Sequence, residues 1–138
     1  MSKKKIFISF DYENDKDIKG CLLSQLESDI VEIAVSNKSI EKPIEEKWKK
    51  EAKRRISGYN YVIFLCGRHT DEATGVSAEM TITRELGKPY FLLCGRRNRE
   101  VKKPSGSLKE NKVYKWTPDN LEKLLHNKRD ALIEVKII

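Results

Sequence analysis

The stretch YNYVIFLCGRHTDEATGVSAEMTITRELGKPYFLLC, residues 59–94, decides the fold of this chain. It opens and closes with short apolar segments, residues 59–66 and 89–94, whose β-branched, aromatic and aliphatic side chains are typical of buried strands. Between them, residues 75–86 are predicted to form a helix, because a glycine and soon afterwards a proline end the pattern. A strand, a helix and a second strand in this order predict two parallel strands joined through a helix.

The same alternation of strands and helices extends outward from this stretch. On its amino-terminal side the apolar pattern predicts two strands and two helices, at residues 5–10, 15–28, 30–35 and 44–56. On its carboxyl-terminal side it predicts a short strand at 113–116 and a helix at 118–128, opened by the N-cap pair Thr117-Pro118. This order predicts an α/β, flavodoxin-like three-layer sandwich, with a mostly parallel sheet of about five strands flanked by helices.

In such a sheet, functional sites lie beyond the carboxyl ends of the strands. The candidate site is therefore expected in the loops that follow the predicted strands, at residues 11–15, 36–43, 67–75 and 95–103. The tail ALIEVKII, residues 131–138, is predicted to be an extra strand or a frayed end.

The composition is that of a globular chain rich in charged residues. Its 138 residues predict a single domain spanning 1–138, and 36% of them are charged, against about 25% in an average domain. No apolar run approaches the ~18 residues of a membrane span, and the first residues lack the pattern of a signal peptide, which favours a cytoplasmic protein. The three cysteines, Cys21, Cys66 and Cys94, each lie in an apolar run and are predicted to be buried, reduced thiols rather than metal ligands.

The net charge of +7 is concentrated in residues 96–115, which contain eight basic and two acidic residues. Such a segment could bind nucleic acid or a phosphorylated small molecule, or could be a solvated loop. Single-stranded nucleic acids are usually bound by aromatic side chains interleaved with the basic ones. Here only Tyr114 and Trp116 come close, and both fit the predicted strand, so nucleic acid is a disfavoured partner.

Glu79 is the one charged residue on the apolar face of the helix that follows the third predicted strand. On a helical wheel it falls within the arc formed by Val76, Met80, Ile82, Thr83 and Leu86. A carboxylate that faces inward must be paired or lie in a polar cleft, because an unpaired buried charge is costly. It could accept hydrogen bonds from ribose hydroxyls, or stabilise positive charge on an anomeric carbon as a glycosidic bond breaks. Alternatively, the carboxylate has a structural role only, favoured by the helix N-terminus or bonded to an amide of a neighbouring loop.

The bond between nicotinamide and ribose in NAD suits a single carboxylate, because its leaving group is already cationic and needs no general acid. Other chemistries find less support, since the sequence has neither a GxGxxG nor a GxxxxGK[ST] phosphate loop. A phospho-receiver domain would need an aspartate at the end of the third strand, where Leu65, Cys66 and Gly67 stand. The two histidines, His69 and His126, are predicted to be surface residues.

Four segments of the chain resemble the TIR-like domain of ThsB from bacterial Thoeris antiphage defence. They are KKIFISFDYENDKD at 4–17, HTDEATGVSAEM at 69–80, GKPYFLL at 87–93 and VYKWTPDNL at 113–121. The block ATGVSAE is the most specific of them. The resemblance runs in order over residues 4–128, leaves out the tail at 129–138, and implies the flavodoxin-like fold of TIR domains.

The resemblance implies an enzyme of the NAD glycohydrolase or ADP-ribosyl cyclase type, which uses NAD as its substrate and needs no cofactor or metal. Cleavage would release nicotinamide, and the ADP-ribose part would be cyclised or joined to another group to give a messenger that activates a separate antiphage effector protein. In the family the catalytic acid is a glutamate on the helix after the third strand, and its match here is Glu79. The resemblance also implies self-association and a phage-derived trigger for activity.

The same resemblance implies which residues bind the substrate. Phe10 and Asp11 match the edge of the family's nucleotide pocket, where Phe10 could stack on nicotinamide or could be an ordinary core residue. Asn14, Thr74 and Ser77 are weaker substrate-binding candidates.

The chain also departs from the eukaryotic TIR pattern. Val76, Ser77 and Ala78 stand where many eukaryotic TIR domains have Trp-Cys before the catalytic glutamate, and the loop at 36–43 lacks a Pro-Gly pair. The interaction loop of eukaryotic TIR domains is therefore not carried over. The alternative function is a non-catalytic TIR-like module that binds a nucleotide or a protein partner and turns over nothing.

Overall fold

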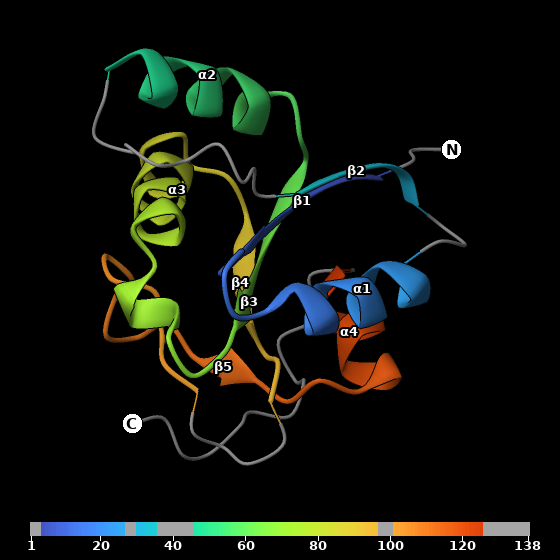
Figure 1. The fold of residues 1–138 in the computed structure, drawn as a ribbon. Coiled ribbons are helices and arrows are strands. Elements are labelled where there is room, and N and C mark those ends of the chain that lie inside the picture. Colours follow the sequence, from blue (N-terminus) through green and yellow to red (C-terminus); the bar gives the residue numbers. More distant parts are fainter. Residues whose placement is uncertain (1–3, 27–29, 36–45, 97–100, 126–138) are drawn as a thin grey trace.

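The computed structural model describes residues 4–26, 30–35, 46–96 and 101–125 of the chain. Within these ranges, five parallel strands form one sheet in the order β2-β1-β3-β4-β5 (Figure 1). Their bounds are Lys4–Phe10 for β1, Ile30–Val35 for β2, Tyr61–Cys66 for β3, Tyr90–Cys94 for β4 and Val113–Tyr114 for β5. This is the strand order of flavodoxin-like sheets, so the predicted fold class is confirmed.

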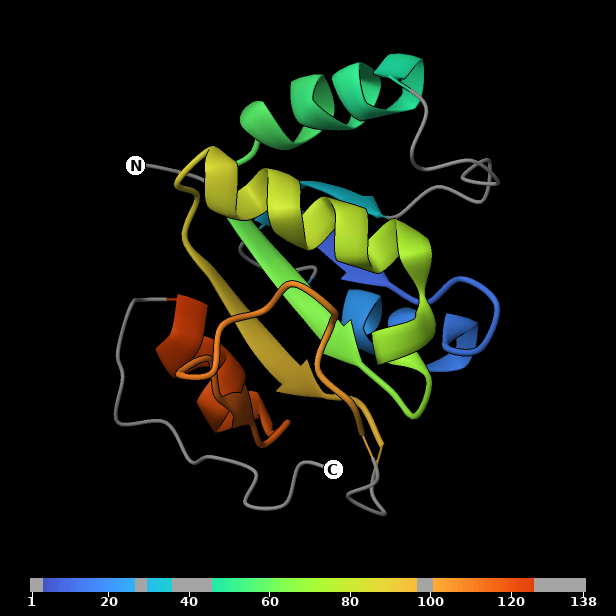
Figure 2. The ribbon, with the colours of Figure 1, turned by 90° about the vertical axis from the view of Figure 1, so that its left-hand side faces the viewer.

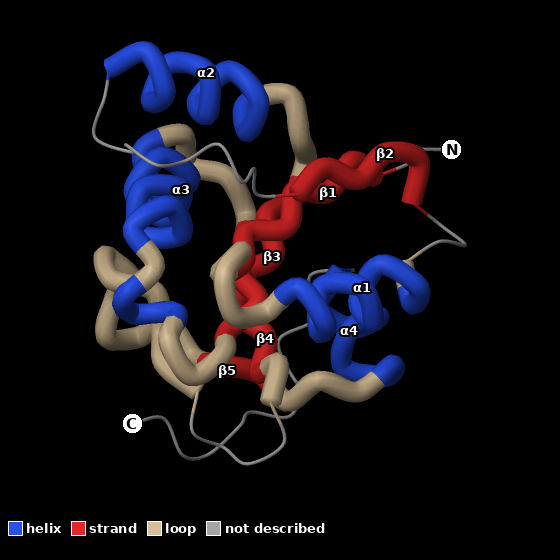
Figure 3. The backbone as a smooth tube through the Cα atoms, in the orientation of Figure 1, coloured by secondary structure: helices blue, strands red, loops and turns tan. Residues whose placement is uncertain are grey.

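Helices cover both faces of the sheet. The described residues form the α-helices Lys16–Gln25 (α1), Glu46–Ser57 (α2), Thr74–Glu85 (α3) and Pro118–Leu125 (α4). Helices α1 and α4 lie on one face and α2 and α3 on the other, which gives three layers (Figures 1 and 3). None of the helices in the described ranges is long and apolar enough to cross a membrane.

Strand β1 divides the hydrophobic core in two, because successive side chains of a strand point to opposite faces of the sheet. Ile6, Ile8 and Phe10 pack in the core beneath α1 and α4. Phe7 packs in the core beneath α2 and α3, and Ser9 faces the same side, where its hydroxyl bonds to a side chain of α3. Ser9, the second-to-last residue of β1, therefore places a hydroxyl group in the interior between the sheet and α3.

The structure differs from the sequence prediction mainly at the ends of elements. Residues 70–72, predicted as loop, form a single 3-10 turn (η1, Thr70–Glu72) before α3. Strand β5 is two residues long instead of four, because the chain turns toward α1 and α4 after it. There the Trp116 indole N–H donates to Gln25 and the Asn120 side chain donates to the Lys115 carbonyl. The backbone N–H of Asn120 donates to the Thr117 hydroxyl at 3.0 Å, and this bond confirms the predicted N-cap of α4.

The prediction that all three cysteines are buried is wrong for Cys21, which is exposed, whereas Cys66 and Cys94 are buried. The buried positions of α1 are Ile18 and Leu22, which lie four residues apart on one face of the helix. Cys21 is about 100° away from Leu22 on the wheel, which places it at the edge of that face.

Several predictions fall on residues outside the described ranges. They concern the loop at 36–43, the surface position of His126, the end of the last helix at residue 128 and the tail at 131–138.

Candidate active site

Glu79 lies in the second turn of α3 and faces the sheet. Its exposed fraction is 1%, and its Oε1 accepts a hydrogen bond of 2.7 Å from the hydroxyl of Ser9, which is itself 0% exposed. Ser9 pairs in register with Phe64 of β3, and so it lies in the middle of the sheet near the carboxyl ends of two strands. The sequence placed Glu79 on the apolar arc of its helix, and its burial confirms that position.

The local sequence explains how α3 presents a carboxylate inward. The buried residues of α3 follow helical spacing and are Val76, Glu79, Met80, Ile82 and Thr83. One turn after Glu79, the Thr83 hydroxyl donates to the Glu79 backbone carbonyl at 2.7 Å, a common local bond of threonine within helices. Ahead of the helix, the Gly67 N–H donates to the Thr70 hydroxyl at 2.7 Å and orders the turn that leads from β3 into α3.

Ser9 is a buried hydrogen-bond partner of Glu79 that the sequence analysis missed. The pattern contained a sign of it, because Ser9 is the only polar residue in the otherwise apolar run IFISF at residues 6–10. A hydroxyl at a buried strand position is unfavourable unless it is hydrogen-bonded, so this residue implies a buried polar partner.

The loop after β1 holds Asp11 and Asn14 together. Asp11 is 5% exposed, and its carboxylate accepts hydrogen bonds from the Glu13 N–H at 3.1 Å and from the Asn14 side-chain amide at 2.7 Å. These bonds are those of an aspartate that shapes a turn. The two predicted substrate-binding residues are thus neighbours, and in this structure the Asp11 carboxylate is engaged in folding the loop.

An ion pair between the buried Asp15 and the half-buried Arg96 joins this loop to the end of β4. Asp15 is 1% exposed, and its Oδ1 accepts a hydrogen bond of 2.8 Å from the guanidinium of Arg96, which also bonds to Asp17 and to the Asn14 carbonyl. Burial raises the pKa of the Asp15 carboxyl, and the hydrogen bond and charge of Arg96 only partly offset this. The Arg96 hydrogen bond lowers the pKa of the exposed Asp17.

Gly67, the first residue after β3, makes room for this pair. A Cβ at this position would lie 2.6 Å from the Cγ of Asp15, so a larger residue would displace the carboxylate. Asp15 Oδ2 is buried and has no hydrogen-bond partner among the residues that the structure describes. The carboxyl ends of β1, β3 and β4 are therefore joined through one acidic side chain. Across the described residues, no group of three or more His, Cys, Asp or Glu side chains is arranged to hold a metal.

These elements also carry the sequence relationship that identifies the chain. The model of the family described as Thoeris protein ThsB, TIR-like domain, matches residues 7–100, a span that includes Ser9, Asp15, Glu79 and Arg96. The chain belongs to this family. A comparison with curated proteins finds no match. The matched span runs from β1 past the end of β4 and leaves β5 and α4 outside.

Phe10 of this ThsB TIR-like domain lies on the opposite face of the sheet from Glu79. Its ring is 1% exposed, packs in the core with α1, and lies 5.9 Å from the ring of Tyr12 between centroids. Ser9 and Phe10 point to opposite faces of the sheet because they are consecutive residues of a strand. A role for Phe10 in stacking on nicotinamide would require the ring to leave this core.

Thr74 and Ser77 lie in the first turns of α3, before Glu79. Thr74 is exposed, and the half-buried Ser77 donates its hydroxyl to the Ser105 carbonyl at 3.1 Å. The segment of residues 101–108 lies along this side of α3 (Figure 2), where the Gly106 carbonyl accepts a bond of 2.8 Å from Arg84. Ser77 therefore lies about 200° around the helix from Glu79, on a side that the 101–108 segment covers.

In the segment predicted as a basic loop, the side chain of Lys103 bonds to backbone carbonyls of the same segment. Lys103 Nζ donates to the carbonyls of Leu108 and Asn111, both at 2.9 Å, and so closes the loop on itself. Arg96 is held by the acidic loop described above. Among the basic residues of this segment that the structure describes, Arg96 and Lys103 therefore have structural partners, which reduces the charge that these two offer to an anionic ligand.

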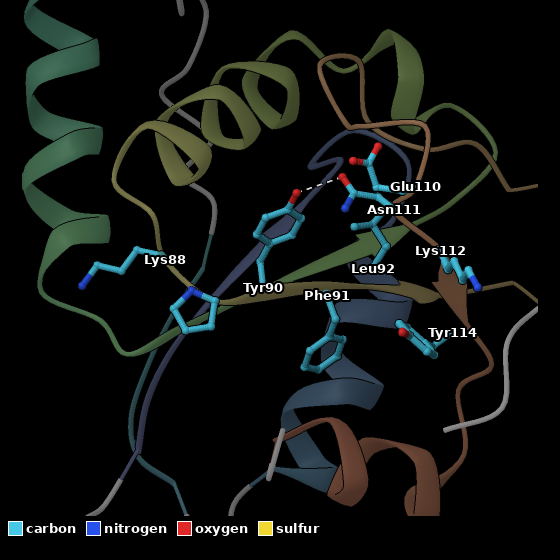
Figure 4. Close-up of a pocket in the computed structure, with 9 residues that line it drawn as sticks. Lys88, Tyr90, Phe91, Leu92, Glu110, Asn111, Lys112 and Tyr114 are labelled. Atoms are coloured by element: carbon cyan, nitrogen blue, oxygen red, sulfur yellow. Dashed lines mark hydrogen bonds between the residues drawn. The ribbon is translucent and has the colours of Figure 1, made fainter. Parts of the chain in front are cut away.

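A pocket of about 300 Å³ lies at the opposite end of β4 from the candidate site (Figure 4). It is lined by residues 88–92, residues 110–112 and Tyr114. The Tyr90 hydroxyl donates to the side-chain carbonyl of Asn111 at 2.8 Å across it. This pocket lies at the amino-terminal end of β4, so it contributes nothing to the surroundings of Glu79.

Proposed function

We propose that this ThsB TIR-like domain cleaves NAD between nicotinamide and ribose, with Glu79 as the catalytic carboxylate. The product would be an ADP-ribose-derived, cyclic messenger that activates a separate antiphage effector. One observation carries the proposal. In a member of this family, a single buried carboxylate on the helix after β3 is held by a hydroxyl near the carboxyl ends of the central strands.

The chemistry requires little from the protein besides this carboxylate. When the bond between the ribose anomeric carbon and the nicotinamide nitrogen breaks, its electron pair moves to the nitrogen and neutralises the pyridinium ring. Nicotinamide then leaves without a proton, and positive charge develops on the ribose. The Glu79 carboxylate stabilises that charge, as carboxylates do in glycoside hydrolysis. Attack by a nucleophile of the same nucleotide closes a ring, whereas attack by water gives ADP-ribose.

The surroundings of Glu79 favour this kind of stabilisation. Its helix packs in an apolar core with Phe64, Val76 and Met80, so water is largely excluded. A fixed charge in such a place interacts more strongly with a developing charge than it would in water.

Access to Glu79 is the step that we propose is regulated. With 1% of Glu79 exposed, NAD reaches the carboxylate only when the segments packed around α3 move. This closed arrangement supports our proposal that the enzyme acts only after a trigger. Thr74 and Ser77, which flank the start of the same helix, are then proposed to contact the substrate.

The decisive experiment is nucleotide profiling by mass spectrometry of cells that express this chain, with and without phage challenge. The matched control is Glu79→Gln, which keeps the size of the side chain and its ability to accept the Ser9 hydrogen bond but removes the charge. We expect NAD loss and a new ADP-ribose species that the control does not produce. If several phages elicit no difference between the two proteins, the non-catalytic nucleotide-binding module becomes the better description.

A further inference from the structure

We infer that Ser9 is a positioning residue for Glu79, and that its hydroxyl orients the carboxylate and keeps it ionised for cleavage. The inference rests on the proposed function, and it adds to it a residue on a different element of the fold. Three features support it: the geometry of the bond, the apolar surroundings and the rigidity of the strand that carries Ser9.

The geometry is that of a well-formed hydrogen bond. The distance of 2.7 Å between Ser9 Oγ and Glu79 Oε1 suits a hydroxyl that donates to a carboxylate oxygen. Both side chains are almost fully buried, with exposed fractions of 0% and 1%. A bond of this kind between two buried groups fixes the direction in which the carboxylate oxygens point.

The surroundings explain why a donor is needed. Phe7, Phe64, Val76 and Met80 belong to the core on this side of the sheet. An apolar environment favours the neutral form of a carboxyl group, whereas a hydrogen bond donated to the anion favours the charged form. A neutral carboxyl group cannot stabilise a developing cation, so the Ser9 donor supports the protonation state that the reaction requires.

The position of Ser9 makes it a rigid support. Strand β1 lies between β2 and β3, and Ser9 pairs in register with Phe64 of β3. Side chains on paired strands are placed more precisely than side chains on loops. The strand therefore holds the donor end of the bond fixed, and we expect it to stay fixed when the segments packed around α3 move to admit substrate.

A matched pair of variants separates positioning from simple structural support. Ser9→Ala removes the hydroxyl that bonds to the Glu79 carboxylate. Thr83→Val removes another fully buried hydroxyl, which makes a bond of the same 2.7 Å length to the backbone carbonyl of the same residue. Both changes remove one buried hydrogen bond, but only the first changes the environment of the carboxylate. Ser9→Thr keeps a hydroxyl donor at this position and tests whether the donor alone restores product formation.

Two readouts are needed. The first is the amount of nucleotide product in phage-challenged cells at equal protein level. We expect a fall of about tenfold to a hundredfold for Ser9→Ala, the effect of losing a hydrogen bond to a charged group. Product from Thr83→Val should stay within about threefold of wild type, since a neutral bond away from the carboxylate is worth less. Ser9→Thr should recover most of the product, provided that its melting temperature shows a folded protein.

The second readout does not depend on activity. In purified protein labelled with ¹³C-glutamate, the Glu79 carboxyl signal is assigned by its absence in Glu79→Gln and is followed as pH changes. We expect the midpoint of this titration to move upward by about one pH unit or more in Ser9→Ala, and to stay in place in Thr83→Val.

The outcomes are distinguishable. Wild-type product yield in Ser9→Ala would overturn the inference, as would equal losses in Ser9→Ala and Thr83→Val. If the wild-type chain makes no product under any challenge, the proposed function fails and the titration decides on Ser9 alone. An unmoved midpoint in Ser9→Ala would then overturn the inference as well.

Discussion

Removing Arg96 should leave the buried carboxylate of Asp15 without its counter-charge. In the folded protein, Asp15 is 1% exposed, and one of its oxygens accepts a hydrogen bond of 2.8 Å from the Arg96 guanidinium. Its other oxygen has no hydrogen-bond partner within the described part of the chain. Breaking a fully buried ion pair from one side costs about 3–5 kcal/mol. The Arg96 side chain is 25% exposed, so water can enter part of the vacated space, and we reduce the expected cost of Arg96→Ala to about 2–3 kcal/mol.

The cost should depend on pH in a direction that the structure determines. Burial raises the pKa of Asp15 above its ordinary value of 3.8, and Arg96 opposes this rise. A carboxyl group with a raised pKa in the folded state lowers stability as pH climbs from the unfolded value through the folded value. Without Arg96 the pKa of folded Asp15 lies higher still, so this window extends upward. Arg96→Ala should therefore lose more stability at pH 7 than at pH 4.

Urea unfolding followed by circular dichroism measures these free energies, with the double variant Asp15→Asn/Arg96→Ala as the decisive comparison. If the unpaired charge of Asp15 causes the loss of stability, adding Asp15→Asn to Arg96→Ala should recover about 1–2 kcal/mol of the free energy of unfolding, because the neutral amide needs no counter-charge. Our reasoning is refuted if the two single costs add within about 0.5 kcal/mol, or if the loss is the same at pH 4 and pH 7.

Two further predictions follow from the glycines and cysteines. Gly67→Ala should destabilise the fold by about 2–3 kcal/mol in the same urea assay, because the added methyl group overlaps the Asp15 carboxylate. Gly20 lies in helix α1 with open space around it, so Gly20→Ala should stabilise the fold by about 0.5–1 kcal/mol. In native protein, a thiol reagent should modify the exposed Cys21 quickly and leave the buried Cys66 and Cys94 unreacted until urea is added. Burial also raises the pKa of the Cys66 thiol, which disfavours the reactive thiolate. Fast modification of more than one thiol would contradict the structure.

The regular elements and the position of Glu79 could be predicted because both depend on local periodicity. Apolar runs mark β3 and β4, and the helical wheel isolates Glu79 without any knowledge of the sheet. The end of β5 could not be predicted, because it is set by contacts between Trp116 and Gln25, far apart in the sequence. The Asp15–Arg96 pair also escaped prediction, since the two residues are 81 positions apart and each looked like an ordinary loop charge.

The last two residues of β1 and Asp11, which follows them, show why the candidate site is split between environments. Alternation along the strand sends Ser9 to the α3 face and Phe10 to the α1 face, and the turn that follows engages Asp11 with its own loop. A family motif that spans these three residues therefore does not describe one continuous surface. The carboxylate of Glu79 is held by a strand, and the predicted pocket edge is held by a loop. We expect a change that admits substrate to move the loop more readily than the hydrogen-bonded pair Ser9–Glu79, because the loop is tied to the neighbouring strand ends through the Asp15 side chain, whereas Ser9 is fixed within β1.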